Sequence, residues 1–144
     1  MANRISKGTI FVGDIDPGNN ARLVKVARVA LGAVDTGGGV FSWQNPTGQN
    51  VIVGRVVLDV TTPSSGACTL DVGTTATSAT TLSDNLIDGL SAATAAQVAD
   101  NLGNAGTNGK TRQKLATGKW VTGSVASGAS AGIAGYAYIH YWAI

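Results

Sequence analysis

The chain has 144 residues, a length typical of one domain with its own hydrophobic core. Apolar residues make up 44% of the chain and charged residues only 12%, a balance that excludes an intrinsically disordered protein. The formal net charge of +2 is too small to predict nucleic-acid binding, and no apolar run is long enough to predict a membrane span. Low charge and many small residues favour a protein that covers much of its surface against copies of itself or a larger assembly.

Residues 1–20 are predicted to form an N-terminal arm, ahead of a single domain over residues 21–144. Ile10 and Phe11 belong to a short apolar patch that is followed by the turn-rich sequence DIDPGNN. Such a segment cannot support itself, so we expect it to dock on the domain or on a neighbouring molecule. It contains no apolar stretch of the length that a secretory signal needs, so we expect the protein to be made in the cytoplasm without export.

Three extended segments are predicted before residue 62. Residues 21–34 are rich in β-branched side chains and are flanked by Gly and Asn clusters, which favours a strand over a helix. A short strand is predicted over 40–43. A turn at 45–48 then leads into a long strand over 51–61.

The region 55–72 carries the clearest alternation in the chain. Apolar residues recur at every second position on both sides of a Pro-Ser-Ser-Gly turn: Val56, Leu58 and Val60 before it, and Cys68, Leu70 and Val72 after it. This pattern predicts a β-hairpin with one buried face. Cys68 is the only cysteine, which excludes an intramolecular disulfide and a thiolate metal site, and we expect it to pack in the core.

A compact apolar hook is predicted after the Thr/Ser/Ala-rich residues 74–81. Ser83-Asp84 resembles a helix N-cap before Leu86 and Ile87. Gly89 is expected to end that turn quickly. We expect the two apolar side chains of this hook to be exposed and available to a partner.

The remaining elements predict one short helix and two strands. Residues 92–102 are the best helix candidate, with Gly103 just past the end. Strands are predicted over 119–125 and 133–144, and the last strand carries large side chains on both faces, so it is either buried on two sides or in contact with a partner. Several strands with Gly-rich turns point to an all-β protein, a β-sandwich or small barrel.

No catalytic, cofactor or metal site is predicted. His140 is the only histidine and has no supporting motif, so a hydrogen-bonded strand residue is the better interpretation. The spacing of Asp84 and Asp88 resembles a glycosidase pair but is better explained by capping and loop hydrogen bonds. Residues 13–20 space oxygen ligands loosely like a calcium loop, but they lack its terminal Glu and predict an ordinary turn. An enzyme is therefore not expected.

Aromatic residues are the main candidates for a binding surface. They supply large contact areas to protein or carbohydrate partners, and they also fill the cores of β-sandwiches. The sequence leaves both interpretations open for the six residues Trp43, Trp120, Tyr136, Tyr138, Tyr141 and Trp142.

Two long stretches resemble the small head decoration (capsid cement) proteins of tailed phages. They are GRVVLDVTTPSSGACTLDVGTTATSATTLSDNLIDGLSAATA and the ending GSVASGASAGIAGYAYIHYW, roughly the C-terminal two-thirds of the chain. The features shared with that family are a strand pair before a Thr/Ser/Ala run, an N-L-I-D-G-L hook, and a final S-A-G-x-x-G-x-A-x-I-x-Y strand. The resemblance implies a jelly-roll-like β-sandwich, often trimeric, that binds the outside of an icosahedral phage head and locks major capsid subunits together.

The sequence thus predicts a non-enzymatic virion protein on the capsid surface, assembled in the bacterial cytoplasm, with the major capsid protein and further copies of itself as partners. We expect no cofactor, no nucleic acid and no membrane. The residues expected to make partner contacts are Ile10, Phe11, Leu86, Ile87, Tyr138 and Trp142. The alternative is a carbohydrate-binding module of a phage fibre or tail component, which would grip glycans through Trp43, Trp120 and Tyr136.

Overall fold

The structure is a computed structural model, and it describes residues 23–32, 39–78, 82–93 and 95–144. The predicted arm, with Ile10 and Phe11, lies outside the described residues.

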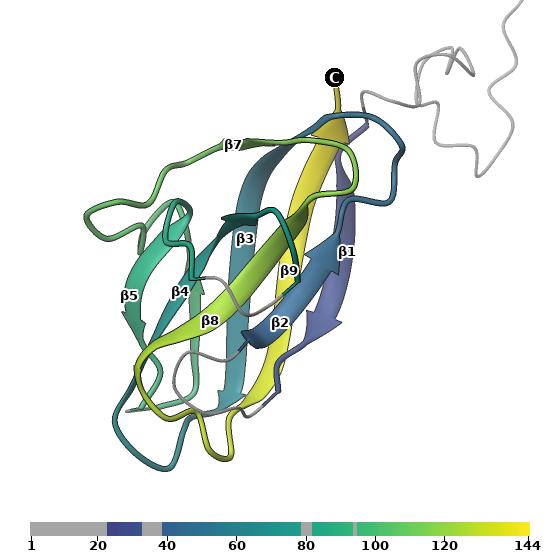
Figure 1. Cartoon of the computed structure of the whole chain (residues 1–144). Helices are drawn as coiled ribbons and strands as arrows, with labels where there is room; N and C mark the ends of the chain where they lie inside the picture. Colours follow the sequence, from purple (N-terminus) through teal and green to yellow (C-terminus); the bar gives the residue numbers. More distant parts are fainter. Residues whose placement is uncertain (1–22, 33–38, 79–81, 94) are drawn as a thin grey trace, which may run out of the picture.

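Two antiparallel sheets form a β-sandwich (Figure 1). Sheet A contains β1 (Lys25–Ala30), β9 (Ala134–Ala143) and β3 (Val51–Thr62), with β6 (Gln97–Asp100) and β7 (Gln113–Leu115) sharing the far edge of β3. Sheet B contains β2 (Gly39–Gln44), β8 (Trp120–Gly128), β4 (Cys68–Thr75) and β5 (Ile87–Ser91), in that order. The predicted all-β class is confirmed.

The order of the strands is that of a jelly roll. The first half of the chain pairs with the second half in reverse order: β1 with β9, β2 with β8, β3 with β6 and β7, and β4 with β5. The chain is therefore one long antiparallel hairpin, with its tip between β4 and β5, that is rolled so that successive pairs fall in alternate sheets. This arrangement is the double-sheet solution by which an all-β chain limits its exposed edges.

The core lies between the sheets and follows the alternation visible in the sequence. Val56, Leu58 and Val60 of β3 are buried, as are the alternate residues Ala137, Ile139 and Tyr141 of β9. Across the interior, the ring of Tyr141 packs against Trp43 of β2 with a centroid distance of 4.7 Å. Cys68 is also buried, as predicted, and burial raises the pKa of its thiol, which keeps it in the unreactive protonated form.

The predicted hairpin over 55–72 is wrong in its pairing. Both strands exist and both bury the predicted faces, but β3 belongs to sheet A and β4 to sheet B. The Pro-Ser-Ser-Gly connection crosses from one sheet to the other, and Ser64 anchors it through hydrogen bonds with the carbonyl of Ala92. Alternation shows which residues of a strand face the core but not which strand lies beside it.

The predicted helix over 92–102 is also wrong, and the described residues contain no helix. Residues 97–100 form β6, which pairs with the edge of β3 and places Ala99 in the core opposite Leu58. The edge of β3 offers backbone hydrogen bonds and a buried place for one small side chain. This tertiary pairing overrides the weak helix preference of an Ala-rich segment.

The apolar hook is wrong as well. Leu86 and Ile87 are both 0% exposed, and Ile87 begins β5 opposite Val72 of β4. The N–H of Leu86 donates to the carbonyl of Val72, so this segment extends sheet B and forms no capped turn. The side chains that were expected to be exposed therefore belong to the core.

Candidate functional site

The two sheets differ in what covers their outward faces. The outward residues of sheet B include Thr122, Ser124 and Asp71, all of which are buried. Ser83 lies directly over Gly73 of β4, where a Cβ atom would collide with it. Because segments of the chain already cover this face, it offers little surface to a partner.

The outward residues of sheet A, which we call the outer face, are arranged in cross-strand rows. On β9 they are the residues that alternate with the buried ones; Tyr136, Tyr138 and His140 have neighbours at the same height on β1 and β3, and Trp142 has one on β3. The four rows are Ala30, Tyr136, Asp59 and Val98; Arg28, Tyr138, Val57 and Asp100; Val26, His140 and Arg55; and Trp142, Ile52 and Lys114.

The outer face carries several exposed apolar side chains among its charged ones. Of the seven large hydrophobic side chains that are exposed in the described residues, four lie on it or at its rim: Val24, Val26, Val98 and Leu102. They flank the aromatic residues of β9, and the guanidinium of Arg28 lies 4.4 Å from the ring centroid of Tyr136. Exposed apolar side chains beside aromatic residues on one face of a sheet are characteristic of an interaction surface.

One end of the outer face is hollowed into a groove of about 450 Å³. Trp142 lies against the backbone of β3 at Gly54, where any Cβ would collide with its ring. Gly54 is the extra residue of a β-bulge, since Val53 pairs with Tyr141 and Arg55 with His140. The bulge thus makes room for the Trp142 ring, and the groove is lined by Val24, Gly54, Arg55, Leu102, Thr111, Arg112, His140 and Trp142.

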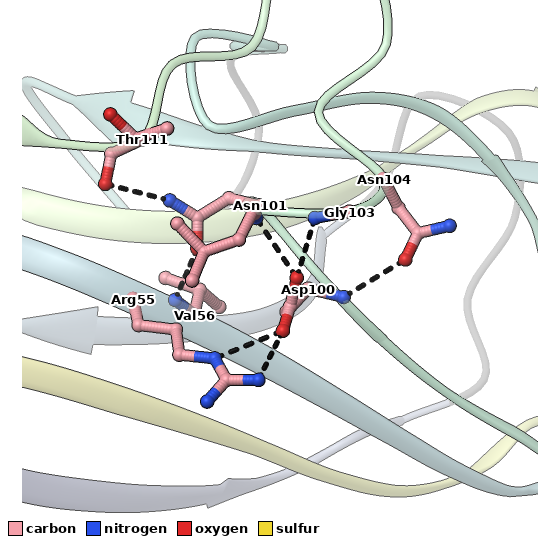
Figure 2. A network of polar contacts seen from close by, with 8 residues as sticks. Arg55, Val56, Asp100, Asn101, Gly103, Asn104 and Thr111 are labelled. Atoms are coloured by element: carbon pink, nitrogen blue, oxygen red, sulfur yellow. Dashed lines mark hydrogen bonds and ion pairs between the residues drawn. The ribbon is translucent and has the colours of Figure 1, made fainter.

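A polar network fixes the rim of this groove (Figure 2). The carboxylate of Asp100 accepts hydrogen bonds from Nε of Arg55 at 2.9 Å and from the N–H of Gly103 at 2.8 Å, and it forms an ion pair with Arg55. The neighbouring Asn101 is fully buried, and its side chain joins β3 to the segment before β7. Leu102 thereby lies between two hydrogen-bonded residues, Asn101 and Gly103, which fix the position of its backbone at the rim.

The ionised carboxylate of Asp100 is favoured by its surroundings. The N–H of Gly103, the Arg55 guanidinium and the N–H of Leu102 lower the pKa of Asp100, and burial acts in the opposite direction.

We therefore expect Asp100 to contribute stability that is complete above the ordinary aspartate pKa of about 4 and is lost as the pH falls through the lowered folded pKa. In urea titrations, wild-type protein should exceed the Asp100→Asn variant in free energy of unfolding at pH 7, and the gap should close toward pH 2. An equal gap at both pH values would contradict this assignment.

The carboxylates that resembled a catalytic pair serve a loop. Asn108 donates its side-chain amide to Asp84 at 2.8 Å and its backbone N–H to Asp88 at 3.1 Å. Burial raises the pKa of the nearby Asp71, opposed by a hydrogen bond from Gly89 and reinforced by the two other carboxylates. Asp84 and Asp88 therefore accept hydrogen bonds from a loop residue, in agreement with the loop hydrogen bonding that the sequence favours.

No group of three or more His, Cys, Asp and Glu side chains that could hold a metal ion occurs within the described ranges. Within those same ranges, no helix is long and apolar enough to cross a membrane.

The structure separates the residues that the sequence grouped as partner contacts. Tyr138 and Trp142 lie together on the outer face, whereas Leu86 and Ile87 lie inside the sandwich. The three aromatic residues proposed for glycans are dispersed. Trp43 packs in the interior, Trp120 pairs with Gln44 and Thr75 in sheet B, and Tyr136 is on the outer face of sheet A.

Sequence reasoning missed the other members of the outer face, above all Val26, Val98, Leu102 and Arg112. Val26 could have been found, because it alternates with Arg28 and Ala30 inside the strand predicted over 21–34, whereas Val98 lies in the segment predicted as a helix. Leu102 and Arg112 could not, since they come from loops whose positions depend on the Asn101 network.

Comparisons of the chain with protein-family models, with curated proteins and with solved structures returned no match.

Proposed function

We propose that this protein is a capsid decoration (cement) subunit that binds the outside of an icosahedral phage head through the outer face of sheet A. In this proposal it acts on the virion surface as a homo-oligomer, with a trimer favoured, and its partner is the major capsid protein. Its role is mechanical: it ties neighbouring capsid subunits together and has no enzymatic activity.

The observation that carries the proposal is the difference between the two outward faces. One is covered by the chain's own segments, and the other leaves Tyr138, Trp142 and the valines around them accessible. Aromatic residues beside Arg are the side chains that contribute most to protein–protein binding. A sheet whose strands are already held by backbone hydrogen bonds also loses little conformational entropy when it docks on another surface.

The carbohydrate-binding alternative is less well supported by the geometry. A glycan platform needs aromatic rings on one accessible surface, whereas Trp43 packs in the interior, Trp120 belongs to sheet B and Tyr136 lies on the outer face of sheet A. The outer face keeps Tyr136 beside Tyr138, with a centroid distance of 6.3 Å, so a glycan array remains a useful comparison.

Co-sedimentation with phage heads that lack this protein tests the proposal. We expect wild-type protein to bind, and the Tyr138→Ala/Trp142→Ala variant to bind about thirtyfold or more weakly, since anchors of this kind contribute about 2 kcal/mol or more. Light scattering of the free protein reports whether it is a trimer.

The matched control is Leu82→Ala, which shortens an exposed apolar side chain elsewhere on the molecule. It should bind heads as wild type does. Glycan binding without head binding, or full occupancy by the double variant in its folded state, would refute the proposal.

A further inference from the structure

The groove at the end of the outer face has a distinct chemistry that does not depend on capsid binding. Its floor is the Trp142 ring, and the side chains of Val24 and Leu102 form apolar walls. Arg55 is neutralised by Asp100, but the side chain of Arg112 has no ion-pair or hydrogen-bond partner in the described part of the chain. A ligand that fits must place a bulky apolar side chain on Trp142 and a carboxylate near Arg112.

We propose that the chain's own N-terminal segment 10–16, with the sequence IFVGDID, occupies this groove. The segment places Ile10, Phe11 and Val12 next to two carboxylates, Asp14 and Asp16. It therefore combines the two features that the groove requires. Aromatic packing of Phe11 on Trp142 and charge pairing with Arg112 are the contacts that hold it.

The connection supports binding within one molecule. Val24 lines the groove, and only residues 17–23 separate it from Asp16. Those residues reach at most about 27 Å when extended, and they begin with Pro-Gly-Asn-Asn, residue types that favour a reversal of chain direction. So short a tether gives an effective concentration of the order of millimolar, which suffices to hold even a weakly binding segment.

Occupation of the groove has a consequence for the outer face. Trp142 belongs both to the groove and to the row beside Ile52. A bound segment covers Trp142, so any partner that needs this side chain must displace the segment or bind on top of it.

Paramagnetic broadening in the full-length protein tests the proposal. A nitroxide label is attached to Thr9→Cys, next to the segment. The native Cys68 is buried and is spared by the reagent. In ¹⁵N-labelled protein we expect the indole signal of Trp142 and the amide signals of Leu102 and Thr111 to lose most of their intensity, while Ser127 in sheet B keeps its own.

Two charge variants check the contacts. Asp14→Asn/Asp16→Asn and Arg112→Ala should each restore most of the lost intensity, whereas Lys119→Ala, which removes an exposed charge outside the groove, should restore none. Without any label, the first variant should also shift the Trp142 indole signal, which keeps the test valid if the labelled protein folds poorly.

A mixed sample identifies the source of the segment. Labelled protein without ¹⁵N is combined with unlabelled ¹⁵N protein, so that only contacts between molecules cause broadening. We expect none. Broadening of the same signals in the mixed sample would assign the groove to the segment of a second copy and overturn the proposal, as would the absence of broadening in both samples. Head binding plays no part in this measurement, so its outcome is separate from that of the decoration proposal.

Discussion

Replacing Leu86 by alanine is expected to lower the free energy of unfolding by about 2–5 kcal/mol, the usual cost of truncating a buried leucine. The side chain is fully buried at the entry to β5, and its backbone N–H is bonded to β4. The cavity would open beneath the pairing of the two strands at the tip of the jelly roll. Urea unfolding, with midpoints converted to free energies by linear extrapolation, measures the effect.

Leu82 is the matched control, because the same substitution there removes the same atoms from a side chain that is 49% exposed. We expect Leu82→Ala to change the free energy of unfolding by no more than about 0.5 kcal/mol. If both variants were equally stable, Leu86 could not be part of the core. Partner binding by the hook, as expected from the sequence, would then be open again.

The contrast between these two leucines shows why part of the fold was predictable and part was not. Along β3, alternation with period two identified Val56, Leu58 and Val60 as inward residues, because one face of the strand is buried by the opposite sheet. The inward Val51 and Val53 precede the bulge at Gly54, which breaks that alternation. Around Leu86 the sequence has Ser-Asp before two apolar residues and Gly soon after. That local pattern suits a capped turn equally well, and only pairing with β4 decides in favour of a strand.

The sequence did not predict which strands lie side by side in the sheets. The Pro-Ser-Ser-Gly turn is short enough for a hairpin, yet Ser65 donates its N–H to Ala131 and Ser64 to Ala92, so the connection is bonded to two other segments. Those bonds come from residues far along the chain, and no local signal reports them. For the same reason the helix predicted over 92–102 is wrong, since pairing with the edge of β3 makes residues 97–100 a strand.

The sequence likewise predicted one part of the candidate site and missed another. Tyr138 and Trp142 were found because they belong to one alternating strand whose two faces both carry large side chains. The groove beside Trp142 was not found, since it depends on the bulge at Gly54 and on a loop that begins at Leu102. Features made by one strand can be read from the sequence, whereas features made by register and loop anchoring cannot.

Replacing Asn101 by alanine is expected to lower the free energy of unfolding by about 2–3 kcal/mol, which is large for a polar substitution. Its side-chain oxygen accepts the N–H of Val56 at 2.8 Å, and its amide group donates to the carbonyls of Lys110 at 3.0 Å and Thr111 at 3.2 Å. The variant would leave the buried N–H of Val56 without a partner. The carbonyls of Lys110 and Thr111 belong to exposed residues and can accept hydrogen bonds from water instead.

Asn104→Ala serves as the control for Asn101→Ala. Its side chain is exposed and accepts a single hydrogen bond, from the N–H of Asp100 at 3.2 Å, so we expect a loss of no more than about 0.5 kcal/mol. Hydrogen exchange adds a local readout, because the Val56 amide should exchange faster in Asn101→Ala than in Asn104→Ala under the same conditions. If the two variants were equal in stability and in exchange, the loop that carries Leu102 and Arg112 would not be anchored by Asn101. The rim of the groove would then lack the rigidity on which docking of the N-terminal segment depends.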